Sequence, residues 1–103
     1  MNKSKEEIKS VEVVVLEAGK TEGYFQKYVG SPTLLDMQDL VGGYIEMLPI
    51  GDSHYMVLNE EGIIDKLPYN QLANEYLRQK SPLAADWNTI VGDVFIINKE
   101  DVE

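Results

Sequence analysis

The sequence contains no cysteine, one histidine (His54) and one tryptophan (Trp87). Without cysteine the chain forms neither a disulfide framework nor a thiolate metal site or nucleophile. A lone histidine leaves any metal site dependent on carboxylates, so we expect no metal and no cofactor. The sequence also lacks the run of about 18 apolar residues that a membrane-spanning helix needs and the apolar segment of a signal peptide. We therefore expect a soluble, cytoplasmic protein.

Basic residues are scarce: 9 lysines and arginines face 18 aspartates and glutamates, which gives a formal net charge of −9. Such a charge repels phosphate backbones, so we expect no direct binding to nucleic acid. It is compatible with simple solubility, with a basic protein partner, or with a surface that imitates DNA. With 103 residues, the chain is long enough for one domain with a hydrophobic core but too short for two.

The predicted domain is α+β and covers residues 11–98, with a flexible tail before it (residues 1–10) and an acidic tail after it (residues 99–103). Residues 11–17, VEVVVLE, are β-branched and almost continuously apolar, which predicts a central strand covered on both faces. The alternating pattern of residues 24–29 favours an extended conformation, although Phe25 and Val29 would also suit one helical turn.

The chain is organised around the stretch from Ser31 to Ile50. Ser31 followed by proline predicts a helix start, and Gly42 predicts its end because glycine accepts the left-handed conformation. Gly43 allows a close reversal of the chain. A strand over residues 44–50 follows, and its Pro49 places it at an edge or a bulge of the sheet.

Further strands are predicted at residues 55–58, 63–67 and 94–97. Asn70 is expected to cap a second helix, whose apolar side chains recur at helical spacing, and residues 83–89 are expected to form a loop or short turn. Together these elements predict a mostly antiparallel sheet of four or five strands with two helices packed on it.

No catalytic pattern emerges, and we expect a protein that is not an enzyme. Gly19-Lys20-Thr21 follows a hydrophobic strand, but a phosphate-binding loop requires a glycine five positions earlier, where Val14 stands. Adjacent acids such as Glu60-Glu61 do not share a face in a helix or a strand. The aromatic residues beside loops suit interfaces or planar ligands, although they would also serve as a cover for the core; they are Tyr24, Tyr44, Tyr69 and Trp87.

Several blocks resemble an uncharacterised family of small proteins, described as a domain of unknown function and found mainly in bacteriophages and mobile elements. These blocks are LVGGYIE, NEEG, LPYN and VGDVFII, and the resemblance extends over about Leu34 to Ile97. The resemblance implies an accessory protein of the host bacterial cytoplasm that counters host defence or tunes host machinery.

Two mechanisms fit that context, and from the sequence we place the first ahead of the second. In the first, a homo-oligomer binds and sequesters a nucleotide-derived immune signal, such as a relative of cyclic ADP-ribose, without cleaving it. In the second, an acidic inhibitor, with imitation of DNA as one form of it, binds a host defence or replication protein. The candidate ligand-binding residues are Tyr44, Asn59, Tyr69, Asn70, Arg78 and Trp87. The candidate structural residues are Gly42, Gly43, Gly62, Pro68 and Gly92.

Charge weighs against each mechanism in a different way. A net charge of −9 disfavours a phosphate-bearing ligand unless Arg78, Lys20 or Lys66 lines the pocket. Against imitation of DNA, the acidic residues are dispersed along the sequence and do not form helical rows.

Overall fold

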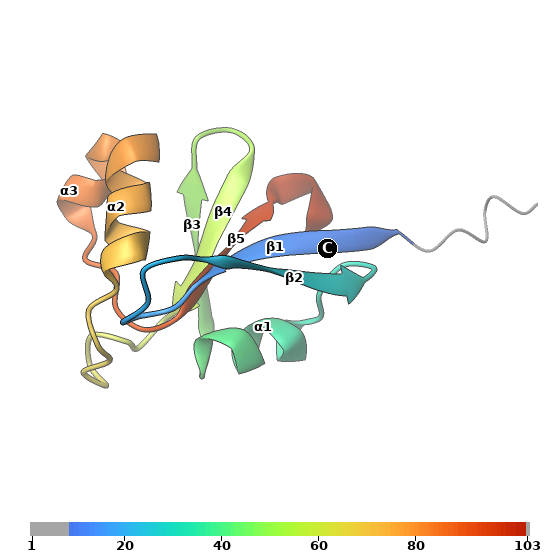
Figure 1. The fold of residues 1–103 in the computed structure, drawn as a ribbon, viewed down its shortest axis with the longest axis horizontal. Helices are drawn as coiled ribbons and strands as arrows, with labels where there is room; N and C mark the ends of the chain where they lie inside the picture. Colours follow the sequence, from blue (N-terminus) through green and yellow to red (C-terminus); the bar gives the residue numbers. More distant parts are fainter. Residues whose placement is uncertain (1–8, 103) are drawn as a thin grey trace, which may run out of the picture.

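A computed structural model describes residues 9–102, which form one five-stranded antiparallel sheet with helices on both faces (Figure 1). The architecture is therefore α+β, as the sequence predicts. In chain order the elements are β1 (Ser10–Leu16), β2 (Tyr24–Val29), α1 (Leu34–Val41), β3 (Ile45–Ile50), β4 (His54–Asn59), α2 (Gln71–Lys80), α3 (Pro82–Trp87), β5 (Val94–Asn98) and the short 3₁₀ helix η2 (Lys99–Asp101).

The sheet consists of two hairpins joined by the last strand, in the order β2-β1-β5-β4-β3. β5 lies between β1 and β4 and is antiparallel to both, with Ile96 opposite Val14 on one side and Met56 on the other. β2 and β3 are the two edge strands. The sheet therefore becomes continuous only when the C-terminal strand is in place.

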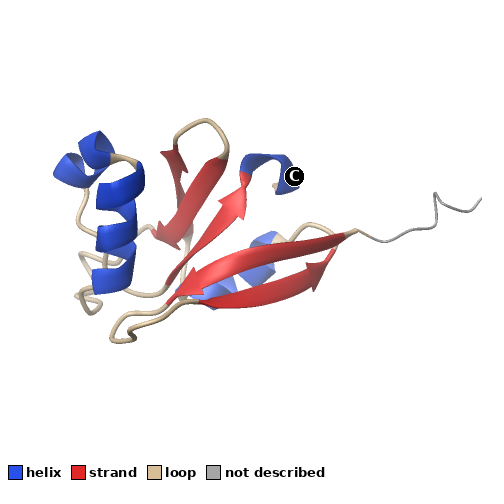
Figure 2. Cartoon of the chain, turned by 45° about the horizontal axis from the view of Figure 1, so that its top comes forward, coloured by secondary structure: helices blue, strands red, loops and turns tan. Residues whose placement is uncertain are grey.

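The helices lie on both faces of the sheet (Figure 2). Side chains alternate across the sheet and build one apolar core on each face. From β1, Val13 packs in the core beneath α1, whereas Leu16 packs in the core beneath α2. Glu12 is exposed, so the predicted cover on both faces is present only in the second half of the strand. The first core contains Val11, Val13, Val15, Met37, Val41, Val57, Phe95 and Ile97. The second contains Leu16, Ile50, Met56, Ala73, Leu77, Ile90, Val94 and Ile96.

The start of α1 differs from the prediction: Thr33, and not Ser31, caps the helix. The Thr33 hydroxyl accepts a hydrogen bond from the Asp36 backbone N–H (3.0 Å), and the Asp36 carboxylate accepts one from the Thr33 N–H (2.9 Å). This reciprocal capping box requires an acid or amide three residues after the cap, and Asp36 meets that requirement for Thr33 alone. The helix ends at Gly42, as predicted.

The prediction of a strand at residues 63–67 is wrong, because the chain forms consecutive turns there. The Gly62 N–H donates to the Asn59 carbonyl and the Asp65 N–H donates to the Glu61 carbonyl, so local bonds replace a strand ladder. Ile63 and Ile64, the side chains that suggested a strand, are 63% and 78% exposed.

The helices on the second face begin at Gln71, directly after its cap Asn70, and at Pro82. The Asn70 side chain accepts a hydrogen bond from the Ala73 N–H (3.0 Å), as its predicted role as a helix cap requires. α3 occupies the segment predicted as a loop, and none of its residues is buried. Within residues 9–102, no helix combines the length and apolar character needed to cross a membrane.

The structure describes most of the predicted C-terminal tail but only the last two residues of the predicted N-terminal tail. Residues 1–8 of the predicted N-terminal tail lie outside the described residues, and Ser10 already belongs to β1. Of the predicted acidic tail, residues 99–101 form η2. Lys9 and Asp101 form an ion pair of 3.2 Å, which connects η2 to the start of β1.

Candidate functional site

Two depressions meet at Gly42, at the C-terminal end of α1. We call the surface that they form the Gly42 surface. The first depression has a volume of about 290 Å³ and is lined by Asp39, Leu40, Val41, Gly42, Leu67, Pro68, Gly92 and Asp93. The second has a volume of about 300 Å³ and is lined by Gln38, Gly42, Gly43, Tyr44, Asn59, Glu61 and Asp65.

The wall of the second depression is set by the close approach of Gly43 to Asn59. Gly42 has a φ of +80° and donates its N–H to the Gln38 carbonyl (2.8 Å), which ends α1 and turns the chain towards β3. A Cβ atom on Gly43 would lie 2.8 Å from Nδ2 of Asn59. Any residue other than glycine at position 43 would therefore displace the Asn59 amide from its position below the end of α1.

The wall of the first depression depends on a second close contact, between Gly92 and Leu67. Gly92 has a φ of +76°, and a Cβ atom there would lie 2.7 Å from Cδ1 of Leu67. The Gly92 N–H donates to the Pro68 carbonyl (2.7 Å). Asp93 accepts a hydrogen bond from the Ala18 N–H (3.0 Å), which joins this wall to the end of β1.

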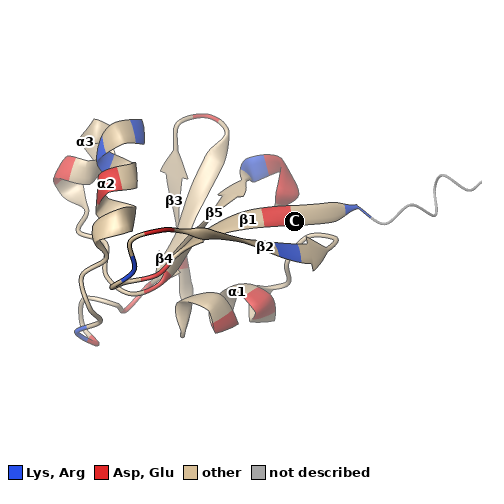
Figure 3. Cartoon of the chain, in the orientation of Figure 1, with Lys and Arg blue, Asp and Glu red and all other residues tan. Residues whose placement is uncertain are grey.

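The Gly42 surface is strongly acidic. Four carboxylates line it, from Asp39 on α1, Glu61 and Asp65 in the turns after β4, and Asp93 before β5. The C-terminal end of α1 adds the negative end of a helix dipole. α1 carries acidic and no basic residues (Figure 3). Among the described residues, no lysine or arginine lines either depression, although Lys66 follows Asp65 in the loop. The local potential therefore favours a cationic group and disfavours a phosphate.

Of the predicted ligand-binding residues, Tyr44 and Asn59 lie together in the second depression. The Tyr44 side chain is 66% exposed, so its ring is available for contact. Asn59 is 7% exposed, and its amide is already engaged. Its Nδ2 donates to the Val41 carbonyl (3.3 Å), and its Oδ1 accepts from the Glu61 N–H (2.8 Å). Asn59 thus fastens the end of α1 to β4.

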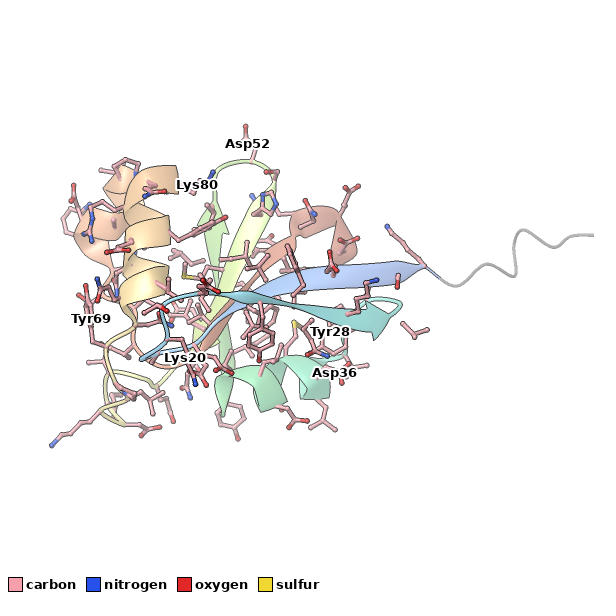
Figure 4. The ribbon with its side chains drawn as sticks, viewed as in Figure 1. Lys20, Tyr28, Asp36, Asp52, Tyr69 and Lys80 are labelled. Carbon is pink, nitrogen blue, oxygen red and sulfur yellow. The ribbon has the colours of Figure 1, made fainter. Side chains whose placement is uncertain are left out.

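Asn70 has a structural role and is not open to a ligand. Its side chain is fully buried, and Nδ2 donates to the carbonyls of Leu16 (2.8 Å) and Gly92 (2.7 Å). The neighbouring Tyr69 is exposed, lies beside the first turn of α2 (Figure 4) and lines neither depression.

Arg78 and Trp87 lie apart from the Gly42 surface, because neither residue lines its depressions. Arg78 is in the last turn of α2, and Trp87 ends α3 with 82% of its surface exposed. Lys20 lines a different, smaller depression of about 190 Å³ beside Gln71. The cations that a phosphate-bearing ligand would require are thus not gathered with Tyr44.

His54 opens β4, and its Nδ1 lies 2.7 Å from the Ser53 hydroxyl. Among residues 9–102, no group of three or more histidine, aspartate or glutamate side chains is arranged to hold a metal ion.

The sequence did not identify Asn74, a second buried amide on the α2 side. Its Nδ2 donates to the Asn70 and Ile90 carbonyls (2.7 and 2.8 Å), and its Oδ1 accepts from the Ile90 N–H (3.0 Å). The available signal was a polar residue between Ala73 and Leu77, on the apolar face of a predicted helix. Asp39, Asp65 and Asp93 were also missed as site residues, because they come from three separate segments.

No curated protein and no solved structure matches the chain. The profile of one family, described as a domain of unknown function (DUF3846), matches residues 8–103. That match covers nearly the whole chain, including both depressions and all five strands. The chain therefore belongs to the DUF3846 family.

Proposed function

We propose that this protein is a non-enzymatic binding protein that engages a basic protein partner through the Gly42 surface. The observation that carries the proposal is the convergence of four carboxylates and a helix C-terminus around two open depressions. Opposite charges accelerate association and fix the orientation of partners. The proposed setting is the cytoplasm of a bacterial host, where a phage accessory protein binds a host defence or replication factor.

The first depression suits a lysine or arginine side chain of the partner. Leu40, Leu67 and Pro68 offer apolar surface to the aliphatic stem, and Asp39 and Asp93 supply carboxylates for the charged head. Long basic side chains commonly bury their stems while their heads remain at a polar rim. The exposed Tyr44 ring in the second depression supplies further contact area.

Sequestration of a nucleotide-derived signal is the second candidate, and the exposed Tyr44 ring favours it. A ring that is 66% exposed beside a depression of about 300 Å³ offers a platform on which a nucleobase stacks. Glu61 and Asp65 in the same depression oppose the phosphates of such a ligand. For this reason we place the basic partner first.

Binding of a lysine-rich decapeptide tests the proposal directly. We expect binding at low salt, weakened about tenfold when Asp39→Asn, Glu61→Gln and Asp65→Asn are combined, since each exposed ion pair contributes about 0.2–1 kcal/mol. All three residues are exposed, so the fold should persist. The matched control neutralises three exposed acids elsewhere, Asp52, Glu75 and Asp86. It changes the net charge equally and should weaken binding much less.

A nucleotide panel in a thermal-unfolding assay distinguishes the second candidate. Cyclic ADP-ribose at 100 times its dissociation constant would add about 2.7 kcal/mol to the free energy of unfolding. Such a shift, abolished by Tyr44→Ala, would replace the basic partner with a sequestered nucleotide. Equal loss of peptide binding in the two triple variants would show that only net charge matters and would refute a specific role for the Gly42 surface.

A further inference from the structure

The edge strand β2 carries an unusual amount of exposed apolar surface. Phe25 is 68% exposed, Val29 78% and Tyr24 44%. The opposite edge, β3, contains Glu46 and Pro49, a charge and a residue without an N–H, both of which discourage pairing with another strand. β2 lacks a proline and has Lys27 as its one charge. The two edges thus differ in their protection against strand addition.

The outer hydrogen-bonding groups of β2 can be assigned from its pairing with β1. The Gly30 N–H donates to the Lys9 carbonyl (2.6 Å), and the register pairs Tyr28 with Val11 and Gln26 with Val13. Because backbone groups alternate in an antiparallel ladder, the even-numbered residues bond to β1. The N–H and C=O groups of Phe25, Lys27 and Val29 therefore point away from the sheet. No strand among residues 9–102 pairs with that side of β2 (Figure 2).

Two copies joined through β2 must obey a two-fold axis perpendicular to the sheet, since only that axis makes the paired edges antiparallel. Odd-numbered residues of one copy then lie opposite odd-numbered residues of the other, and even-numbered residues lie opposite even-numbered ones. The odd-numbered residues, whose backbone groups point outward, form the hydrogen-bonded pairs. An axis at Lys27 would set two like charges directly opposite each other, which is destabilising. An axis at Tyr28 shifts the overlap into the loop after β2.

A two-fold axis at Gln26 gives the most favourable pairs of side chains along β2. Tyr24 then lies opposite Tyr28 of the other copy, and Phe25 lies opposite Lys27, so aromatic and cation–ring contacts replace charge repulsion. Within each copy Glu12 on β1 lies opposite Lys27 and compensates its charge. From this geometry we propose that the protein forms a homodimer through antiparallel pairing of β2 about Gln26, which creates a ten-stranded sheet.

A single cysteine at the axis tests the register, because the chain has no cysteine of its own. Gln26 would face its symmetry mate in a non-hydrogen-bonded pair, with Cα atoms about 4.5 Å apart, which lies within disulfide range. We expect Gln26→Cys to form a disulfide-linked dimer under mild oxidation. The matched control is Val29→Cys on the same strand. In this register the two copies of residue 29 are offset by six positions, about 20 Å, so it should not cross-link.

Charge exchange tests the same contact without a covalent bond. By sedimentation equilibrium, we expect Phe25→Lys to raise the dimer dissociation constant at least tenfold, because the introduced ammonium group would face Lys27 of the other copy. Adding Lys27→Glu should restore the dimer by pairing opposite charges. Val29→Lys, equally exposed on the same strand, should have little effect. Thermal unfolding of each variant verifies that the domain remains folded.

The outcomes separate cleanly. Cross-linking at residue 26 together with rescue by the charge exchange supports the proposed dimer. A monomer at all accessible concentrations, with no cross-link at residue 26, overturns it. A dimer whose dissociation constant is unchanged by Phe25→Lys, or that cross-links through residue 29 in preference to residue 26, uses another surface or register. Either result also overturns the proposal.

Discussion

The two helix layers are fastened to the sheet by buried asparagines, but not to the same degree. On the α1 side, Asn59 is 7% exposed and makes two side-chain hydrogen bonds, at 3.3 and 2.8 Å. On the α2 side, Asn70 and Asn74 form a connected network with Leu16, Gly92 and Ile90. Asn70 is fully buried. The second depression of the Gly42 surface lies at the lighter attachment, beside Asn59, whereas the first is bordered by Gly92 of the α2-side network.

This difference separates a scaffold from a contact surface. A buried amide whose donors are all used fixes its segment, and its loss leaves orphaned carbonyls. The α2 network joins β1, α2 and the segment before β5, so it fastens three parts of the chain far apart in sequence. At the end of α1, a single asparagine leaves carboxylates and an aromatic ring accessible beside it.

The largest effect is expected from Asn70→Ala. The change removes the cap of α2 and leaves the Leu16 and Gly92 carbonyls without their donor. We expect a loss of about 3–5 kcal/mol in the free energy of unfolding, from the cap and two orphaned buried acceptors. Chemical denaturation of the purified variant measures it.

Two companion variants show whether the network or the cap is responsible. Asn70→Ser retains a capping oxygen but loses both donors, so it should recover only the smaller, capping part of the loss. Asn88→Ala removes one half-buried bond to the Ala84 carbonyl and should cost less than about 1 kcal/mol. A loss for Asn70→Ala no greater than that for Asn88→Ala would contradict the proposed role of the network.

A smaller effect is expected on the α1 side. Asn59→Ala removes two hydrogen bonds and should cost about 2 kcal/mol. Gly43→Ala should cost about 1–3 kcal/mol, since its Cβ would lie 2.8 Å from Asn59 Nδ2. When Gly43→Ala is added to Asn59→Ala, it should cost at least about 1 kcal/mol less than in the wild-type protein, because the amide with which its Cβ would clash is absent. Strict additivity would mean that Gly43 is required for another reason.

Most of the fold could be predicted because its signals are local. β-branched runs located β1 and β5, and Asn70 was identifiable as a cap from its place before an apolar helical pattern. The two incorrect predictions concern a strand and a helix cap. Ile63 and Ile64 suggested a strand but remain exposed in turns, and Thr33 displaced Ser31 because only Thr33 finds a reciprocating acid at Asp36.

The candidate site was less predictable because it is assembled from distant segments. Tyr44 and Asn59 could be associated, since a hairpin brings the start of β3 beside the end of β4 and pairs Ile45 with Asn59. Asp39, Asp65 and Asp93 carry no shared pattern, and only the insertion of β5 between two hairpins brings their segments together. Burial of Asn70 depends on the same insertion, so its sequence position could not distinguish a ligand contact from a structural bond.

The smallest effect concerns two tyrosines, one in the core on each face of the sheet. The pKa of Tyr28, which packs beneath α1 (Figure 4), is raised by burial and then by the charges of Asp36 and Asp39. The pKa of Tyr76, on α2, is raised by burial. A tyrosine whose pKa is higher in the folded state stabilises the fold below its ordinary pKa of about 10, and this contribution is lost as the pH rises through the folded value.

Salt should therefore affect the two tyrosines differently. At about 1 M salt the charges of Asp36 and Asp39 are screened, so the pKa of Tyr28 should fall towards its ordinary value, whereas that of Tyr76 should hardly move. Titration of ¹³C-labelled tyrosines by NMR measures both in one sample, with Tyr28→Phe and Tyr76→Phe to assign the signals. At low salt, Tyr28→Phe should also reduce the loss of stability as the pH rises above the ordinary tyrosine pKa of about 10. Equal salt responses would mean that burial alone sets both pKa values, and that the acidic character of the α1 side does not extend to Tyr28.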